Sequence, residues 1–226
     1  MPSRPILITG FRPYGGRGLN PAHEAMRKLD GRTIAGRSVV GRGLPVSLAG
    51  LRGEIDRLVD DIDPAAVISL GLWPGETAIR IERVAVNIAD FEIPDNDGAL
   101  VVDGLVVDAG PGAHLATLPL RAIEHAILGE GIPARVSATA GTFLCNACLY
   151  GFLAALAARR RAVACGFIHV PYLPEQVADL LVSLRKGASL ELHQRTDLAS
   201  MSLDRIVRAI EIAVAETAAA MADAGA

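Results

Sequence analysis

The sequence predicts an α/β fold, a three-layer α/β/α sandwich built on a mostly parallel, twisted open sheet. Short apolar runs alternate along the chain with segments whose apolar residues recur at i, i+3 and i+4, and this alternation of strands and amphipathic helices is typical of layered α/β folds. The chain has 226 residues, of which 51% are hydrophobic. Chains of this length still form one hydrophobic interior, so we expect a single domain over residues 1–226.

The expected strands are short apolar runs bounded by glycine, proline or charged residues. In chain order they are Pro5–Thr9, Ser38–Leu44, Ala65–Leu70, Ile79–Ile88, Ala134–Ser137 and Val163–Val170. Within the fourth run the alternation changes phase, because Ile79 and Ile81 fall on one face whereas Val84, Val86 and Ile88 fall on the other. We therefore expect a bend or a bulge near Glu82-Arg83.

Helices are expected between these strands. Asn20-Pro21 predicts a helix start, because Asn caps free backbone N–H groups and Pro suits the first helical position. Two further helices have an apolar stripe, formed by Leu48, Leu51, Ile55, Leu58, Val59 and Ile62 in one and by Leu203, Ile206, Val207, Ile210, Val214 and Met221 in the last. The Ala-rich tail, residues 218–226, is expected to fray.

Charge and targeting patterns limit the classes of partner. The 22 basic and 25 acidic side chains give a net charge of -3, which offers no electrostatic reason to bind nucleic acid. The longest apolar run, Cys148–Ala158, is shorter than the roughly 18 residues of a membrane span, and the first residues lack a secretory pattern. Three cysteines, an odd number, favour free thiols in a reducing compartment. We expect a cytoplasmic protein without a nucleic-acid or membrane partner.

Aromatic residues are scarce, and most of them lie in loop-like segments at the expected strand ends. These are Phe11, Tyr14, Trp73, Phe91, Phe143, Tyr150, Phe167 and Tyr172. Ligands of open α/β sheets bind beyond the carboxyl ends of the strands, so the clustering favours an apolar pocket there. The alternative, equally consistent with composition, is that the rings simply plug the ends of the sheet.

Cys145 is the candidate nucleophile. The segment Thr139–Asn146 runs from a strand into a helix, and a helix N-terminus stabilises a thiolate and lowers its pKa. A lone cysteine is more often a small buried hydrophobe, and Cys145 with Cys148 also forms the C-x-x-C of a redox dithiol. A zinc site that adds Cys165 and His169 is disfavoured, because residues four apart on a strand lie about 13 Å from each other.

His169 and Glu82 are the candidate partners of Cys145. His169 ends an apolar strand, whereas His23, His114, His125 and His193 lie in polar or helical surroundings, where solvated or capping roles are usual. A buried imidazole can take the thiol proton and return it to a leaving amine. Glu82 lies at the expected bend, and a carboxylate there could fix the tautomer of His169. The alternative is a surface ion pair of Glu82 with Arg80 or Arg83.

Several ordered motifs together resemble the type I pyroglutamyl peptidases (pyrrolidone-carboxylate peptidases), a family of cytoplasmic cysteine peptidases. The matching segments are Gly10-Phe11-Arg12-Pro13-Tyr14-Gly15-Gly16, Asn20-Pro21, Leu44-Pro45-Val46, Gly71 through Gly75, Ile81 through Asn87, Ile93 through Gly98, Gly141 through Asn146, Gly166 through Tyr172, Pro174-Glu175-Gln176 and Ser200-Met201-Ser202. Because these motifs span nearly the whole chain, the resemblance is specific.

The resemblance implies hydrolysis of the amide bond after an N-terminal pyroglutamyl residue of a small peptide, through an acyl-enzyme on Cys145. Glu82, Cys145 and His169 match the catalytic Glu, Cys and His of the family, and the backbone N–H of Cys145 would serve the oxyanion. The substrate-binding positions of the family match Phe11, Tyr14, Asn20, Val46, Ile93, Phe143 and Leu144. The resemblance implies no cofactor and no metal, and a homo-oligomer, dimer or tetramer.

Three charged positions depart from the family pattern. Arg12 stands where the family usually has an acidic residue, and Glu76 and Glu92 stand where it usually has arginine. Loss of a donor near the oxyanion, as at Glu92, removes stabilisation typically worth about a hundredfold in rate. We expect these residues to form a charge-swapped rim of the site, with Arg12 moving inward to compensate for Glu76 and Glu92. Tyr14 in place of the usual Phe adds a hydroxyl that needs a partner.

The main interpretation is an active pyroglutamyl peptidase. The charge reversals leave open a divergent family member with weak activity or another small acyl or lactam substrate. A non-catalytic small-molecule binding protein on the same scaffold is a further alternative. The presence of Glu82, Cys145 and His169 together argues against pure binding.

Overall fold

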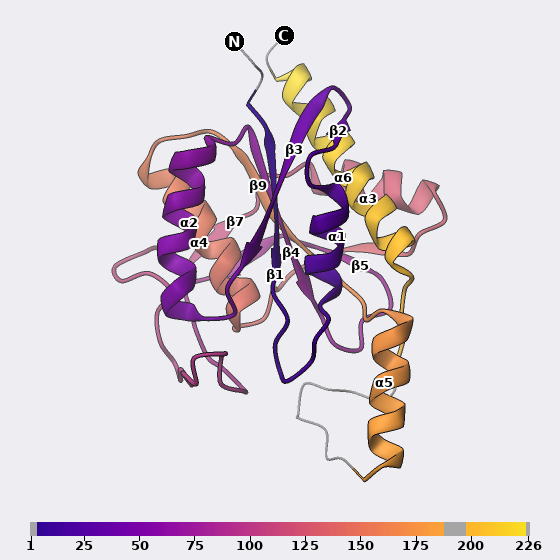
Figure 1. The fold of residues 1–226 in the computed structure, drawn as a ribbon. Helices are drawn as coiled ribbons and strands as arrows, with labels where there is room; N and C mark the ends of the chain where they lie inside the picture. The colour runs from indigo at the N-terminus through magenta and orange to yellow at the C-terminus, as the bar shows by residue number, and fades with distance from the viewer. Residues whose placement is uncertain (1–3, 188–197, 225–226) are drawn as a thin grey trace.

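A seven-stranded sheet organises the structure, a computed structural model that describes residues 4–187 and 198–224 (Figure 1). The strand order is β2-β3-β1-β4-β9-β5-β8. Their bounds are β1 Ile6–Phe11, β2 Thr33–Ile34, β3 Arg37–Leu44, β4 Ala66–Leu72, β5 Ile79–Glu82, β8 Ala134–Ser137 and β9 Ala164–Val170. The central strands β3, β1, β4 and β9 are parallel, whereas β5 runs antiparallel to β9 and parallel to β8. The predicted α/β sandwich with a mostly parallel sheet is confirmed.

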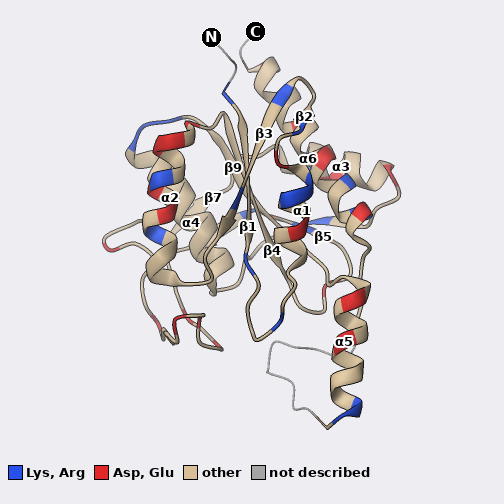
Figure 2. Cartoon of the chain, viewed as in Figure 1, with Lys and Arg blue, Asp and Glu red and all other residues tan. Residues whose placement is uncertain are grey.

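Helices cover both faces of the sheet (Figure 1). On one face lie α1 (Pro21–Leu29), α3 (Leu120–Gly129) and α6 (Leu203–Asp223), and on the other lie α2 (Leu48–Ile62) and α4 (Leu144–Ala158), while α5 (Pro174–Arg185) extends past the end of the sheet. Charged residues lie mainly on the helices and the loops, and fewer of them lie on the strands (Figure 2). None of the described helices combines the length and the apolar character that a membrane span requires.

The central strands are buried on both faces, which explains their continuous apolar runs. Ile6 and Ile8 of β1 face the core under α1 and α6, whereas Leu7 between them faces the core under α2 and α4. Asn20 caps α1 as expected, since its Oδ1 accepts the N–H of Ala22 at 3.0 Å. A side chain that points to the α2/α4 face at the carboxyl end of β4 or β9 therefore meets the first turn of α4.

The predicted fourth strand is divided. β5 ends at Glu82, and Val84–Val86 forms β6, which pairs with β7 (Ala113–Leu115) in a separate two-stranded sheet. The bend expected near Glu82-Arg83 is therefore present, and it is larger than a bulge. The apolar residues behind the predicted phase change do not explain this break, because Val84 and Val86 are only half-buried and Ile88 is exposed, whereas Ala85 and Asn87 between them are buried.

The last helix continues further than its composition suggested. Fraying was expected from Ala218, but α6 extends to Asp223 and Ala218 is buried, because the apolar stripe still packs on the core at that point. Gly225 and Ala226 lie outside the described residues, as does His193.

Candidate active site

A cavity of about 340 Å³ lies beyond the carboxyl ends of β1, β4 and β9. The residues expected to bind substrate all line it, namely Phe11, Tyr14, Asn20, Val46, Ile93, Phe143 and Leu144. Cys145 and His169 lie in the same wall. Trp73, one of the aromatic residues whose clustering favoured a pocket at the strand ends, also lines the cavity. Asp90 and the turn at residues 140–142 line it as well, although the sequence analysis did not name them as substrate-binding residues.

Cys145 is the second residue of α4. The helix begins without a side-chain cap on Phe143, and Gly141, at a φ of 77°, allows the turn before it. The N–H groups of the first helical turn therefore face the cavity region without intrahelical acceptors. Asn146 fixes this turn, because its Oδ1 accepts the N–H of Val86 at 2.9 Å and its Nδ2 donates to Val86 and Ile88 carbonyls at 2.9 Å each.

Gly71 sets the position of the sulfur. A Cβ placed on Gly71 would lie 2.8 Å from Cys145 Sγ and 2.7 Å from the ring of Phe167, so only glycine leaves room for the thiol here. Gly71 of β4 pairs directly with His169 of β9. The register of these two strands thus places the thiol beside the imidazole.

His169 is buried among aromatic rings and bonded to Glu82. The Trp73 ring meets it edge-on with centroids 4.9 Å apart, and the Phe167 ring lies at 4.8 Å. His169 Nδ1 lies 2.8 Å from Glu82 Oε1. Because an ionised carboxylate can only accept, Nδ1 carries the proton, and Nε2 is left as the basic nitrogen.

Glu82 reaches His169 because β5 runs antiparallel to β9. Arg80 pairs with His169 and Glu82 pairs with Phe167, so the carboxylate lies deeper in the sheet than the imidazole. Burial raises the pKa of the Glu82 carboxyl, but the hydrogen bond from His169 and the positive charge of Arg80 more than offset it, and the pKa lies below its ordinary value. Glu82 is therefore ionised near neutral pH although it is fully buried.

The thiol and the imidazole are both held in their neutral forms. Burial raises the pKa of Cys145 well above its usual range, and the nearby Cys148 and Glu82 act in the same direction. Burial therefore acts against the lowering of this pKa that was expected from the helix N-terminus. Burial also lowers the pKa of His169, against the opposing effect of Glu82. The structure therefore describes a thiol beside a neutral imidazole.

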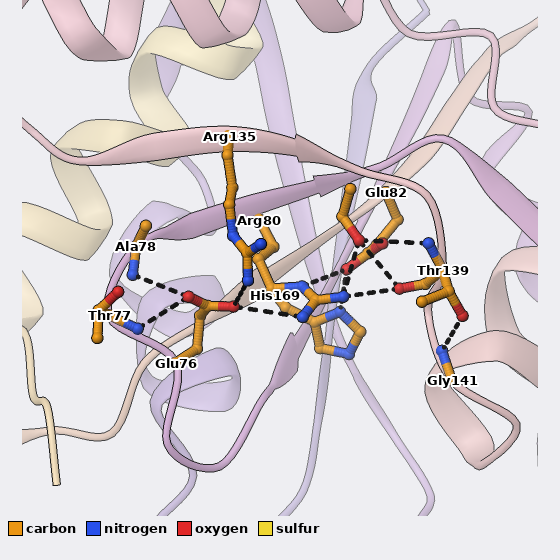
Figure 3. A network of polar contacts seen from close by, with 10 residues as sticks. Glu76, Thr77, Ala78, Arg80, Glu82, Arg135, Thr139, Gly141 and His169 are labelled. Carbon is orange, nitrogen blue, oxygen red and sulfur yellow. Dashed lines mark hydrogen bonds and ion pairs between the residues drawn. The ribbon is translucent and has the colours of Figure 1, made fainter.

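Arg80 and Glu76 form a buried ionic network beside the pair (Figure 3). Arg80 Nε donates to Glu82 Oε1 at 3.0 Å, and a second nitrogen of the same guanidinium lies 3.3 Å from Glu76 Oε2. Arg135 also binds Glu76 Oε2, at 2.5 Å. The alternative of a surface pair between Glu82 and Arg80 is thus half right, since the pair exists but is buried.

The three charge-reversed positions do not form one rim. Glu92 lines the cavity together with Asp90, whereas Glu76 is buried in the ionic network. Arg12 is not part of the cavity wall. The pKa of Glu54 is lowered chiefly by its hydrogen bond with Arg57, and the positive charge of Arg12 makes a smaller contribution in the same direction. The expected movement of Arg12 into the site is therefore not what the structure shows, because Glu76 already has two arginine partners.

The other two cysteines lie away from the cavity. Cys148 and Cys165 are fully buried, and burial raises the pKa of Cys148 to about 12 against the hydroxyls of Ser69 and Thr9. All three thiols are free. Within the described part of the chain, no group of three or more His, Cys, Asp or Glu side chains has a geometry suited to a metal ion.

Comparison with known proteins gives consistent matches over nearly the whole chain. The family pattern described as pyroglutamyl peptidase matches residues 4–220. The pyrrolidone-carboxylate peptidase of Cupriavidus pinatubonensis is 40% identical over 97% of this chain and 95% of its own, and that of Pseudomonas fluorescens is 47% identical over 83% and 86%. Among solved structures, the pyrrolidone carboxyl peptidase of Thermococcus litoralis superposes with a TM-score of 0.88 at 38% identity, covering 98% of this chain and 96% of that one. Pyroglutamyl peptidase I of Bacillus amyloliquefaciens gives 0.85 at 34% identity over 96% and 98%.

Proposed function

Since this chain belongs to the pyroglutamyl peptidase family and is a cysteine-type pyroglutamyl peptidase, we propose that Cys145, His169 and Glu82 are its catalytic residues. The observation that carries the assignment is the 2.8 Å contact between His169 Nδ1 and Glu82 Oε1 beside a cavity that Cys145 lines. The substrates are pyroglutamyl peptides. The family match favours this activity over a divergent acyl substrate or pure binding.

The acylation step uses the neutral pair. Cys145 Sγ attacks the carbonyl carbon of the pyroglutamyl amide bond while His169 Nε2 takes the thiol proton. The imidazolium that forms is stabilised by ionised Glu82. Because burial raises the pKa of the Cys145 thiol, the resting site holds a neutral thiol, and His169 removes its proton during acylation.

The tetrahedral intermediate and its collapse follow from the same groups. The backbone N–H of Cys145, in the uncapped first turn of α4, donates to the oxyanion. His169 then protonates the leaving amine, the C–N bond breaks, and a thioester remains on Cys145. A water molecule deprotonated by His169 hydrolyses the thioester, releasing pyroglutamate and regenerating the thiol.

The cavity wall suits a small uncharged lactam. Phe11, Val46, Ile93 and Phe143 offer apolar surface, and a neutral ring loses little hydration there compared with a charged residue. Asn20 Oδ1 caps α1, and one N–H of its Nδ2 donates to the Arg12 carbonyl at 3.2 Å, so these two bonds fix the orientation of the amide. The second N–H of Nδ2 remains as a donor that a lactam carbonyl in the cavity could accept.

We also propose that the chain is one peptidase domain, works in the cytoplasm and assembles as a dimer or tetramer. Free thiols are usual in a reducing compartment. Large apolar side chains are exposed in and beside the segment between β6 and β7, at Leu100, Val102, Leu105 and Leu115, and they offer surface for a second copy. Light scattering on the purified protein measures the oligomeric state; a monomer would contradict the assembly.

The activity is tested by release of a fluorescent amine from an N-terminal pyroglutamyl conjugate, with a prolyl conjugate as the control substrate. Cys145→Ser is expected to abolish release, whereas Cys148→Ser, on the same helix but packed on the sheet, retains it. Equal loss in both variants would favour the dithiol interpretation. Release from the prolyl conjugate at a similar rate would contradict the proposed pocket.

A further inference from the structure

Arg80 makes several polar contacts beside the proposed catalytic residues, more than a surface ion pair would involve. Its Nε donates to Glu82 Oε1 at 3.0 Å, and one terminal nitrogen donates to Ser137 Oγ at 2.7 Å and to the Thr139 carbonyl at 2.8 Å. The other terminal nitrogen faces Glu76 at 3.3 Å. The side chain is only 8% exposed and does not line the cavity.

The contacts use the shape of a guanidinium as well as its charge. The guanidinium carbon lies 3.8 Å from the ring centre of Trp73, so the plane of the group is fixed from one face. The same Trp73 ring contacts the edge of His169, and it lies 3.6 Å from a Cβ placed on Gly141. Figure 3 shows Arg80 between Glu76, Glu82 and Thr139. Lysine cannot donate along three fixed directions in a plane.

We propose that Arg80 is a positioning residue for the hydrolysis, which holds Glu82 Oε1 toward His169 and ties the turn before Cys145 to the same support. The inference rests on the proposed roles of Cys145, His169 and Glu82. Arg80 Nε and His169 Nδ1 converge on one carboxylate oxygen, at 3.0 and 2.8 Å. Without the first donor, the carboxylate can rotate about its last bond, and the imidazole loses its fixed orientation.

Charge gives the second consequence. His169 is faced by Glu82 and Arg80 from β5, by Glu76 from the segment before β5 and by Cys145 from α4, and Asp90 and Glu92 belong to the same cavity wall. Burial has the largest effect on the pKa of His169 and lowers it; in addition, the positive charge of Arg80 lowers this pKa and the negative charge of Glu76 raises it. Removing Arg80 therefore raises the pKa of His169, and removing Glu76 lowers it.

The test compares the kcat, the KM and the pH dependence of kcat/KM for Arg80→Gln, Arg80→Lys, Glu76→Gln and the double variant Arg80→Gln/Glu76→Gln. Arg80→Gln is expected to lower kcat about tenfold to a hundredfold with little change in KM, because Arg80 does not touch the cavity. The acid limb of the kcat/KM profile of Arg80→Gln moves to higher pH by on the order of one unit, whereas the acid limb of Glu76→Gln moves to lower pH. Arg80→Lys keeps the charge and still loses kcat.

The double variant separates positioning from charge balance. One positive and one negative buried charge are removed together, so the net charge of the ionic network is unchanged, and thermal unfolding checks that the variant is folded. Its kcat stays near that of Arg80→Gln if Arg80 positions Glu82. Recovery to the wild-type kcat, or full activity of Arg80→Lys, would overturn the inference.

Two further variants keep this inference distinct from the proposed function. Glu82→Gln is expected to lose activity, which tests the catalytic assignment independently of Arg80. If Glu82→Gln is inactive and Arg80→Gln is fully active, only the role of Arg80 fails; if Glu82→Gln is fully active, the catalytic assignment itself fails. Arg121→Gln, which removes an exposed charge on α3 paired with Glu124, is the matched control and leaves both kcat and the pH profile unchanged.

Discussion

Gly71→Ala should disable the peptidase without removing any catalytic group. The added methyl would lie 2.8 Å from Cys145 Sγ and 2.7 Å from the Phe167 ring. Nonbonded contacts need about 3.5 to 4.0 Å, so one neighbour must move by about 0.7 Å or more. Phe167 is fully buried and closely packed, whereas Cys145 borders the cavity. The sulfur is therefore the atom that moves.

We expect the displacement of the sulfur to reduce the rate of catalysis more than it reduces the stability of the fold. A displacement near 1 Å at a reacting atom costs on the order of a hundredfold in rate, and overpacking a core position costs about 1 to 3 kcal/mol in the free energy of unfolding. We expect kcat/KM for a pyroglutamyl arylamide to fall about a hundredfold while the protein remains folded in a thermal melt.

Gly53→Ala is the matched control. Gly53 lies in α2 with no atom within 4 Å of an added Cβ, so alanine there should stabilise the helix by about 0.5 to 1 kcal/mol and leave kcat/KM unchanged. If Gly71→Ala keeps the wild-type kcat/KM, the sulfur does not depend on this glycine, and the account of how β4 positions the thiol is wrong.

Three other predictions concern the helix start, the thiol and the cavity mouth. Asn146→Ala should lower the free energy of unfolding by about 2 to 4 kcal/mol in a denaturant titration, because it removes three hydrogen bonds to part-buried backbone groups of Val86 and Ile88; an unchanged midpoint would contradict this. The alkylation rate of Cys145 should keep rising with pH beyond about 8.5, the usual thiol value, since burial raises its pKa; a plateau below neutrality would instead indicate a resting thiolate. Glu92→Gln should reduce the preference for a basic over an acidic residue after pyroglutamate about two- to fivefold in paired kcat/KM measurements, and an unchanged ratio would place Glu92 outside the leaving-group side.

The parts of the fold that depend on local pattern could be predicted from sequence. β1, β4 and β9 are continuous apolar runs because both of their faces are buried, and Asn20-Pro21 begins α1 through its own side chain. Short elements escaped prediction. β2 and β7 have two and three residues, too few to show alternation, and they exist only because a partner strand lies beside them.

The residues of the candidate site could be chosen from sequence, but their electrostatics could not. Cys145 at a helix start and His169 at a strand end are visible as local patterns. The direction of the Cys145 pKa depends on how completely other segments cover the thiol. The partner of Glu76 depends on β5 lying beside β8, which brings Arg135 to it. Both the burial of the thiol and the pairing of Glu76 arise where segments distant in the sequence lie together, so a short stretch of sequence cannot reveal them.

The antiparallel pairing of β5 with β9 also links the activity of the enzyme to the completion of folding. Glu82 and His169 are 87 positions apart in the chain and meet only through this pairing, and Cys145 joins them from a helix between the two strands. Contacts of such long sequence separation form late, after loop closure has been overcome. A chain in which β5 and β9 have not yet paired therefore has a thiol whose base lacks its carboxylate partner, and peptide hydrolysis is restricted to molecules in which this pairing has formed.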